Sequence, residues 1–295
     1  MERTGVPTIM HAKTLRAAAL AALAAAATTA TPARAQNDGS QAETVFDGNY
    51  LTVGAGAVYS PSYEGSDDYV LYPAPVVQGN LLGVAITPRP GGVALDFIPD
   101  PKGAKVGFSL GPTARVRANR TGHIKDPVVK RLGKLDTAIE VGANAGITFY
   151  DLLTGYDSVT VSSDVRWDVA GAHKGMIVAP SVSYFTPLSK GAAVNLSLTA
   201  EHADDDYANY YFTVSPAGSV ASGLPAFQAK GGWKNVGANL FAGVDLDGDL
   251  TNGGLAVFGI AGYNRLLGDA KRTPLTSIRG SRDQWVIGGG LGFTF

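Results

Sequence analysis

Residues that could perform chemistry are scarce in this sequence. The chain has no cysteine, and its only histidines beyond the first 35 residues are His123, His173 and His202. His202 comes shortly before three aspartates at residues 204–206, and a histidine beside carboxylates can act as a general base or as a metal ligand. Neighbouring residues of a strand point to opposite faces, however, so these groups do not converge on one point. We therefore interpret His202 as a residue at a solvated strand end.

No other spacing in the chain matches a catalytic or metal-binding pattern. The G-x-S-x-G and H-E-x-x-H motifs are absent, and Ser162 and Ser197 have no histidine in register with them. A calcium loop that begins at Asp245 would need Gly at its sixth position and Glu at its twelfth, where this chain has Leu250 and Ala256. We predict no catalytic, cofactor-binding or metal-binding residues, no cofactor, and a protein that is not an enzyme.

Charged side chains do recur, and they recur on one face of alternating segments. Between residues 158 and 169, one face carries Ser158, Thr160, Ser162, Asp164, Arg166 and Asp168, and the other carries Val159, Val161, Val165, Trp167 and Val169. Glu140 and Glu201 occupy the polar face of similar segments. These charges either pair into a network that narrows an interior or form a selectivity lining. We favour the network, because about twelve strands enclose only a modest lumen.

The elements that position these residues are strands, because the period is two almost everywhere. The pattern predicts an all-β fold, a transmembrane antiparallel up-and-down β-barrel of about 12 strands. A soluble β-sandwich also alternates, but strands of about 10–15 residues match or exceed the length that crosses a bilayer at a tilt. Pro73 and Pro75 predict an irregular edge or a bulge in the second strand. The predicted strands are 50–59, 69–78, 80–88, 92–98, 104–118, 136–150, 157–169, 174–187, 191–203, 233–246, 253–266 and 283–295.

The connections between these strands fall into two sets. Short turns rich in Gly, Asn and Asp are expected to face the periplasm, and longer loops are expected to be extracellular. The short turns are Gly79 with Asn80, 151–155, 189–191 and 247–253, and the long loops are 61–68, 119–135, 203–232 and 268–282.

The N-terminus resembles a secretion signal. A basic stretch with Lys13 and Arg16 precedes an Ala- and Leu-rich run, and Ala33-Arg34-Ala35 forms an A-x-A cleavage site. We predict a cleaved signal peptide over residues 1–35 for the Sec pathway, a short periplasmic segment over 36–48 and the barrel over 49–295; translation could also start at Met10. Loss of the signal changes the formal charge from −1 to −4, which gives no reason to expect nucleic-acid binding.

Several segments resemble the MipA/OmpV family of outer-membrane proteins, whose founder is the MltA-interacting protein. The matching segments follow the family's order over most of the chain: YSPSYEGS at 59–66, GAHKG at 171–175, YFTPLS at 184–189, YFTVSP at 211–216, ASGLPAF at 221–227, GGWKNV at 231–236, YNRLLGDA at 263–270, GSRDQ at 280–284 and the final Phe295. Residues 119–135 match no segment that we can name.

The resemblance implies a scaffolding role at the cell outer membrane, embedded in its lipid. The founder links a lytic transglycosylase that degrades murein to a bifunctional penicillin-binding protein, so these two are the implied partners. Other members are described as adhesins or as porin-like proteins, which leaves an adhesin or a small-solute channel as alternatives. A lipid-modifying barrel enzyme is the least favoured hypothesis, because the sequence offers no converging catalytic set.

Overall fold

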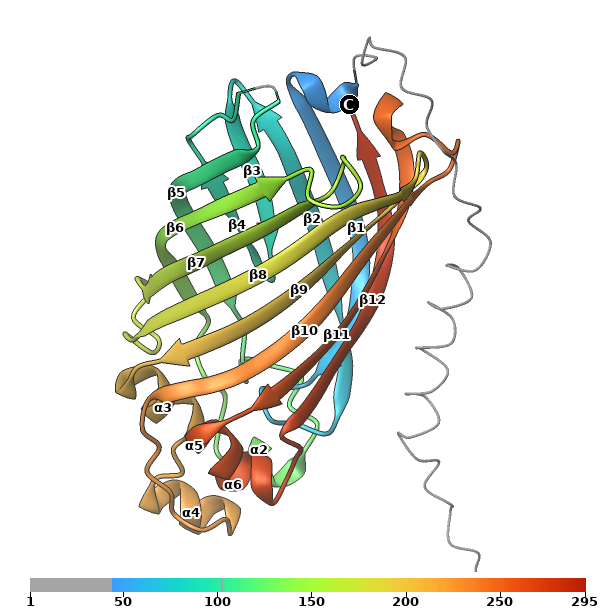
Figure 1. Ribbon diagram of the computed structural model, residues 1–295. Helices are drawn as coiled ribbons and strands as arrows, with labels where there is room; N and C mark the ends of the chain where they lie inside the picture. The colour runs from blue at the N-terminus through green and yellow to red at the C-terminus, as the bar shows by residue number, and fades with distance from the viewer. Residues whose placement is uncertain (1–43, 102) are drawn as a thin grey trace, which may run out of the picture. The chain divides into compact units, whose positions relative to one another are not determined.

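The computed structural model of the protein describes residues 44–101 and 103–295 (Figure 1). The predicted signal peptide and most of the predicted periplasmic segment lie outside the described residues. After a 3-10 turn, η1 (Val45–Asp47), the chain enters a continuous run of strands.

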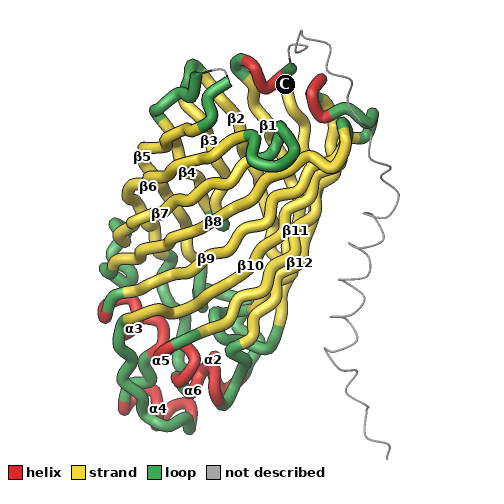
Figure 2. Tube along the Cα trace, in the orientation of Figure 1, coloured by secondary structure: helices red, strands yellow, loops and turns green. Residues whose placement is uncertain are grey.

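Twelve antiparallel strands form one closed barrel, as the sequence predicts (Figures 1 and 2). Each strand pairs with the next one in the sequence, and β12 closes the sheet against β1. Closure excludes the β-sandwich alternative. The strands are β1 (Tyr50–Pro61), β2 (Tyr69–Leu81), β3 (Val84–Arg89), β4 (Gly92–Asp96), β5 (Val106–Arg117), β6 (Ala138–Tyr150), β7 (Ser158–Asp168), β8 (Met176–Ser189), β9 (Ala192–Ala203), β10 (Gly232–Asp245), β11 (Gly254–Leu266) and β12 (Asp283–Thr294).

The alternation of side chains explains which face of each strand is outside. In β7, Val161 and Trp167 are exposed on the outer surface, whereas Asp164 and Arg166 are buried on the inner face. The register pairs apolar residues with apolar residues and polar residues with polar residues: Val161 lies opposite Val182 of β8, and Ser162 lies opposite Ser181. An apolar outer surface of this kind is what a bilayer requires of a closed sheet. Among the described residues, the helices are all too short or too polar to span a membrane.

One end of the barrel carries short turns, and one predicted turn there is wrong. Gly79 and Asn80 pair with β1 inside strand β2, and the turn to β3 is made by Leu82 and Gly83. Both turn residues have positive φ, as a two-residue type I′ turn requires. The sequence does not predict this turn, because leucine seldom adopts a backbone conformation with positive φ.

The opposite end carries long loops that hold short helices, which the strand pattern of the sequence does not predict. These are α2 (Pro127–Lys130), α3 (Asp205–Phe212), α4 (Pro216–Ser222), α5 (Gly268–Arg272) and α6 (Pro274–Ser277). Side chains from four loops pack into one buried cluster, so this end is covered by a cohesive cap: Tyr63, Ile124, Val129, Val214, Leu224 and Leu275. Asp126 strengthens the cap, because it accepts backbone hydrogen bonds at the start of α2 and pairs with Arg279 at 2.7 Å.

Candidate functional site: charged side chains across the lumen

Nine charged side chains meet inside the barrel toward the long-loop end. They come from six strands and from the β1–β2 loop, and we call them the charge belt: Glu64, Arg89, Arg115, Arg117, Glu140, Asp164, Arg166, Glu201 and Lys234. Five are cations and four are carboxylates, so the belt is close to neutral. Most of these side chains are nearly inaccessible to solvent.

Glu140 of β6 is the most deeply buried carboxylate of the belt. Its side chain has no exposed surface, and it accepts hydrogen bonds from Arg117 Nε at 2.5 Å and from Arg166 Nε at 3.2 Å. A buried carboxylate is stable as an anion only when charged donors replace its lost water. The two arginines come from β5 and β7, the strands on either side of β6, so Glu140 joins three adjacent strands.

Asp164 of β7 accepts hydrogen bonds from side chains of strands that are not all adjacent to β7. It accepts from Asn144 Nδ2 at 2.7 Å, from Arg166 Nη1 at 2.8 Å and from Arg89 Nε at 3.1 Å. Arg89 lies on β3, four strands from β7, and its side chain therefore crosses part of the lumen. Thr113 Oγ1 of β5 completes the set at 3.4 Å.

Glu201 of β9 closes the opposite side of the belt. It pairs with Arg115 Nη1 and with Lys234 Nζ, each at 2.7 Å. Lys234 also pairs with Glu64 of the β1–β2 loop. A β-bulge at Trp233 and Asn235 explains the position of Lys234, because the extra residue lets it point inward beside Asn235.

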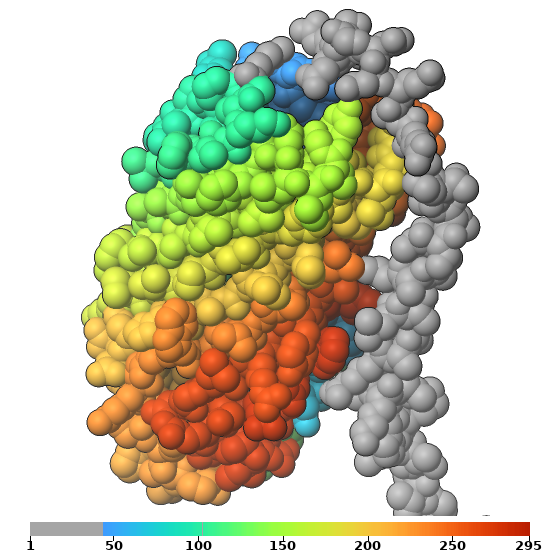
Figure 3. All heavy atoms as spheres, viewed as in Figure 1, coloured from blue at the N-terminus to red at the C-terminus, as the bar shows by residue number. Residues whose placement is uncertain are grey.

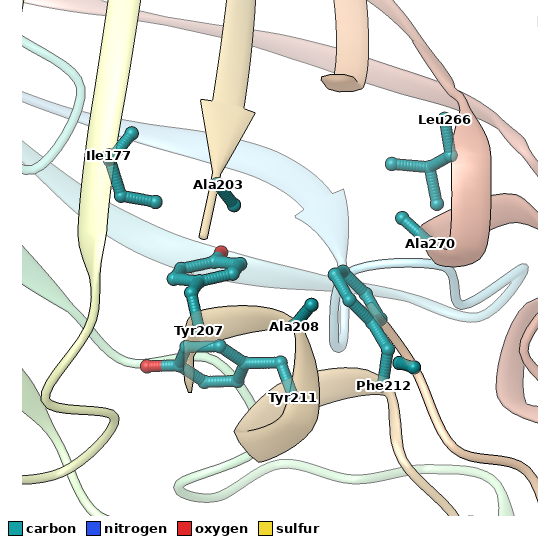
Figure 4. Close-up of a cluster of buried hydrophobic side chains, with 9 residues drawn as sticks. Ile177, Ala203, Tyr207, Ala208, Tyr211, Phe212, Leu266 and Ala270 are labelled. Atoms are coloured by element: carbon teal, nitrogen blue, oxygen red, sulfur yellow. The ribbon is translucent and has the colours of Figure 1, made fainter. Parts of the chain in front are cut away.

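A tyrosine from the β9–β10 loop completes the belt. Helix α3 begins after Asp204, whose carboxylate accepts hydrogen bonds from the backbone N–H groups of Tyr207 and Met176. Tyr207 is fully buried in a cluster of aromatic and aliphatic side chains (Figure 4). Its ring lies 5.1 Å from Arg117 and 5.2 Å from Lys234, and its hydroxyl donates to Glu64 Oε2 at 3.0 Å. Burial raises the pKa of Tyr207, which therefore remains a neutral donor.

His173 lies between the belt and helix α3. Its Nδ1 accepts a hydrogen bond from the backbone N–H of Gly175, and its Nε2 lies 3.4 Å from Glu140 Oε1. The imidazole packs against the rings of Tyr207 and Tyr211, at centroid distances of 4.9 and 5.6 Å. The histidine thus positions the helix over the buried carboxylate.

The lumen toward the short-turn end differs in chemistry. Hydroxyl pairs from adjacent strands line one side, such as Ser162 with Ser181 at 2.9 Å and Thr148 with Thr160 at 3.0 Å. The other side is apolar and includes the stacked rings of Phe241 and Phe258. Phe241 faces inward and is still 36% exposed, so side chains leave open space at this level.

The predicted inward charges are confirmed as a paired network, with one correction. Glu140, Asp164, Arg166 and Glu201 all join the belt. Asp168 does not, because its carboxylate accepts backbone hydrogen bonds from Ala170, His173 and Lys174 at the end of β7. A strand that ends at Asp168 leaves this side chain to organise the next turn rather than the lumen.

The other sequence candidates stay apart. His202 packs against Trp233 on the outer surface, while Asp204 and Asp205 bind backbone N–H groups. In the described part of the chain, no three His, Asp or Glu side chains are placed to hold a metal ion. Asp245 accepts hydrogen bonds within its own turn.

Sequence reasoning missed several belt residues. Arg115 and Arg117 alternate with Ala114 and Val116 in the fifth predicted strand, and this signal could have revealed them. Tyr207 and Glu64 gave no such signal, because loop residues reach the lumen only through the folded structure.

A closed, lipid-facing sheet with a charged interior and a loop cap defines an outer-membrane β-barrel protein. Within that class, residues 53–295 match the family model described as MltA-interacting protein MipA. The chain belongs to this family. A search of curated proteins finds no match.

Solved structures similar to this chain include two outer-membrane proteins and a toluene transporter. The COG4313 outer-membrane channel of Pseudomonas putida F1 has a TM-score of 0.40 and 11% identity, over 89% of this chain and all of that one. OprD of Pseudomonas aeruginosa has a TM-score of 0.35 and 12% identity, over 84% of this chain and 66% of that one. The toluene transporter TodX of Pseudomonas putida has a TM-score of 0.35 and 8% identity, over 84% and 89%.

Proposed function

We propose that this chain is a non-enzymatic scaffold of the outer membrane that holds murein-remodelling enzymes at the periplasmic surface. In this proposal the Sec pathway exports the chain and the signal peptide is removed after Ala35. The long loops face the outside of the cell, and the short turns face the periplasm. The partners are a lytic transglycosylase, in keeping with the family's description, and a penicillin-binding protein.

The charge belt is the observation that carries the proposal. Arg89 and Lys234 reach across the lumen to carboxylates on other elements, and Tyr207 fills the space above them. In a low-dielectric interior, removing one partner of such an ion pair costs about 3–5 kcal/mol of stability. An interior held closed by these contacts favours a barrel that presents surfaces over one that conducts solutes.

The turn between β6 and β7 offers the best periplasmic docking surface. Asp157 organises it by accepting hydrogen bonds from the backbone N–H groups of Leu153 and Thr154 and from the Tyr184 hydroxyl. Leu153 is 81% exposed and Tyr156 is 60% exposed. A preorganised turn with exposed apolar side chains is suited to an apolar pocket on a protein.

Retention of murein enzymes on the immobilised barrel tests the proposal. The parent protein should retain a lytic transglycosylase from detergent-solubilised, crosslinked envelopes. The variant Leu153→Ser/Tyr156→Ser should lose most of this retention. Leu82→Ser is the matched control, because Leu82 is 89% exposed on a different short turn. Equal retention by both variants would remove the docking surface from the proposal, and no retention by the parent would refute the scaffold.

A small-solute channel is the second candidate. The open space beside Phe241 favours it, since solutes could occupy the lumen from the periplasmic side. The channel would require Tyr207 and helix α3 to leave the mouth of the barrel.

A further inference from the structure

Strands β2 and β3 leave a stretch of the barrel wall in which adjacent strands do not pair. Strand β2 pairs with β1 along its whole length, but with β3 only through Gly79, Asn80 and Leu81. Among the described residues, no strand therefore pairs with residues 69–78 of β2 on their other side. Beyond the last pair, Gly79 with Ile86, residues 87–89 of β3 pair with β4 alone.

Prolines occupy the positions that would otherwise extend this pairing. A two-residue turn closes on a hydrogen-bonded pair, here Leu81 with Val84, so odd-numbered residues of β2 and even-numbered residues of β3 direct their backbone groups toward each other. Continuing the register would place Val77 opposite Pro88, and Pro75 opposite Pro90. Proline has no N–H group, so neither position can form the reciprocal pair. We call residues 71–77 together with 87–91 the proline seam.

The seam lies at membrane depth and is closed off above and below. Leu71 and Val77 are exposed on the outer surface, level with the lipid-facing residues of β1. Above the seam, the β5–β6 loop contacts β2: Lys125 Nζ donates to the backbone carbonyl of Tyr69 at 2.6 Å, and His123 packs edge-on against Tyr72 at 5.9 Å. Below it, β2 and β3 are paired.

The chemistry of the seam indicates what could occupy it. Missing N–H groups at Pro73, Pro75 and Pro88 make the seam a poor site for an added β-strand. An open backbone edge at membrane depth is tolerated only where it is covered by protein or lines an interior space. On the β2 side of the seam, the inward-facing Ala74 and Val76 continue the apolar side of the lumen, whereas Arg89 on the β3 side belongs to the charge belt.

We propose that the proline seam is a lateral portal, through which a single-chain amphipathic lipid of the fatty-acid class passes between the membrane and the apolar side of the lumen. The acyl chain would lie against Ala74, Val76 and Phe241, and the charge belt would prevent its release through the long-loop end. This activity is independent of the scaffold function, because it uses the wall and the lumen rather than the periplasmic turns.

Photolabelling tests the portal directly. The mature protein, refolded into phosphatidylcholine vesicles, would be exposed to a palmitate analogue with a diazirine in its acyl chain, and labelled residues would be located by peptide mass spectrometry. The portal predicts label on inward-facing residues such as Phe241 as well as on the outer surface. Label confined to outward-facing residues would overturn it, whatever any variant does.

Two variants locate the route. Ala74→Trp, which fills the inner side of the seam, should lower the labelling of lumen residues at least tenfold. Ala57→Trp is the matched control, because Ala57 lies opposite Pro73 on β1 and faces the lipid; it should leave lumen labelling unchanged. Equal labelling of the lumen in both variants would overturn the portal in favour of entry from the periplasmic end. The chain has no cysteine, so disulfide-linked dimers of Val77→Cys would instead assign the seam to a second copy and overturn the proposal.

Discussion

Glu140→Gln should destabilise the folded barrel strongly, even though it changes few atoms. Glu140 has no exposed surface, and two guanidinium groups depend on its charge. The substitution leaves Arg117 and Arg166 buried with one less anion between them. A neutral amide can accept a hydrogen bond, but it cannot balance a charge.

The contacts that remain in Glu140→Gln determine how much stability the barrel loses. Loss of one partner of a buried ion pair costs about 3–5 kcal/mol. Arg166 keeps Asp164 at 2.8 Å, and Arg117 keeps the more distant Glu201 at 3.7 Å. Because both arginines retain a carboxylate, we expect the lower end of the range, about 3 kcal/mol. Asp151→Asn is the control, because it breaks an ion pair whose Lys105 side chain is 72% exposed, a contact worth about 0–1 kcal/mol.

Urea unfolding of the refolded barrel in vesicles measures both changes, followed by the fluorescence of the three tryptophans. The free energy of unfolding should fall much further for Glu140→Gln than for Asp151→Asn. Equal losses for the two variants, each under about 1 kcal/mol, would refute the view that the belt is a desolvated network that holds the strands together.

Three further predictions follow from the fold and its turns. Val161→Arg should cost roughly 2–4 kcal/mol on the lipid face, and Ser162→Arg on the lumen face should cost less; equal values in vesicle-folding assays would mean that the faces are reversed. Replacing His123, His173 and His202 with alanine should change no turnover, because the refolded parent should hydrolyse neither phospholipid, lipopolysaccharide nor peptide substrates; activity present in the parent and lost in the triple variant would reveal an enzyme. Desolvation raises the pKa of Asp157, but hydrogen bonds from the Leu153 and Thr154 amides outweigh it and lower that pKa to about 2. The 151–157 turn should therefore be fully ordered above about pH 4 and should lose its order as the pH falls toward 2. Amide hydrogen exchange in the turn that does not change over this pH range would contradict the role of Asp157.

Local patterns in the sequence predicted the strands well. A sheet between lipid and a polar lumen requires apolar residues on one face and polar residues on the other, so the sequence alternates. The alternation around Val161 and Asp164 was therefore sufficient to predict β7 and its inward charges. The turn at Leu82 was missed because nothing local identifies a leucine with positive φ.

The full site could not be predicted for a different reason. Tyr207 reaches Arg117 and Lys234 from a loop, and neither contact has a periodic signature. Lys234 faces inward only because a bulge adds a residue to β10. Pro73 and Pro75 did predict an irregular edge, but the opposing Pro88 and the closed ends of the seam emerged only from the strand register.

Conductance of the purified barrel in a planar bilayer tests most directly whether this protein presents surfaces rather than conducts solutes. The charge belt and Tyr207 predict that the refolded parent produces no steady single-channel steps across the physiological voltage range. The variant Glu140→Gln/Tyr207→Ala, which removes both the central anion and the aromatic ring, should produce them. Steady ion conduction by the parent itself would contradict a closed lumen and would favour the solute channel over the scaffold.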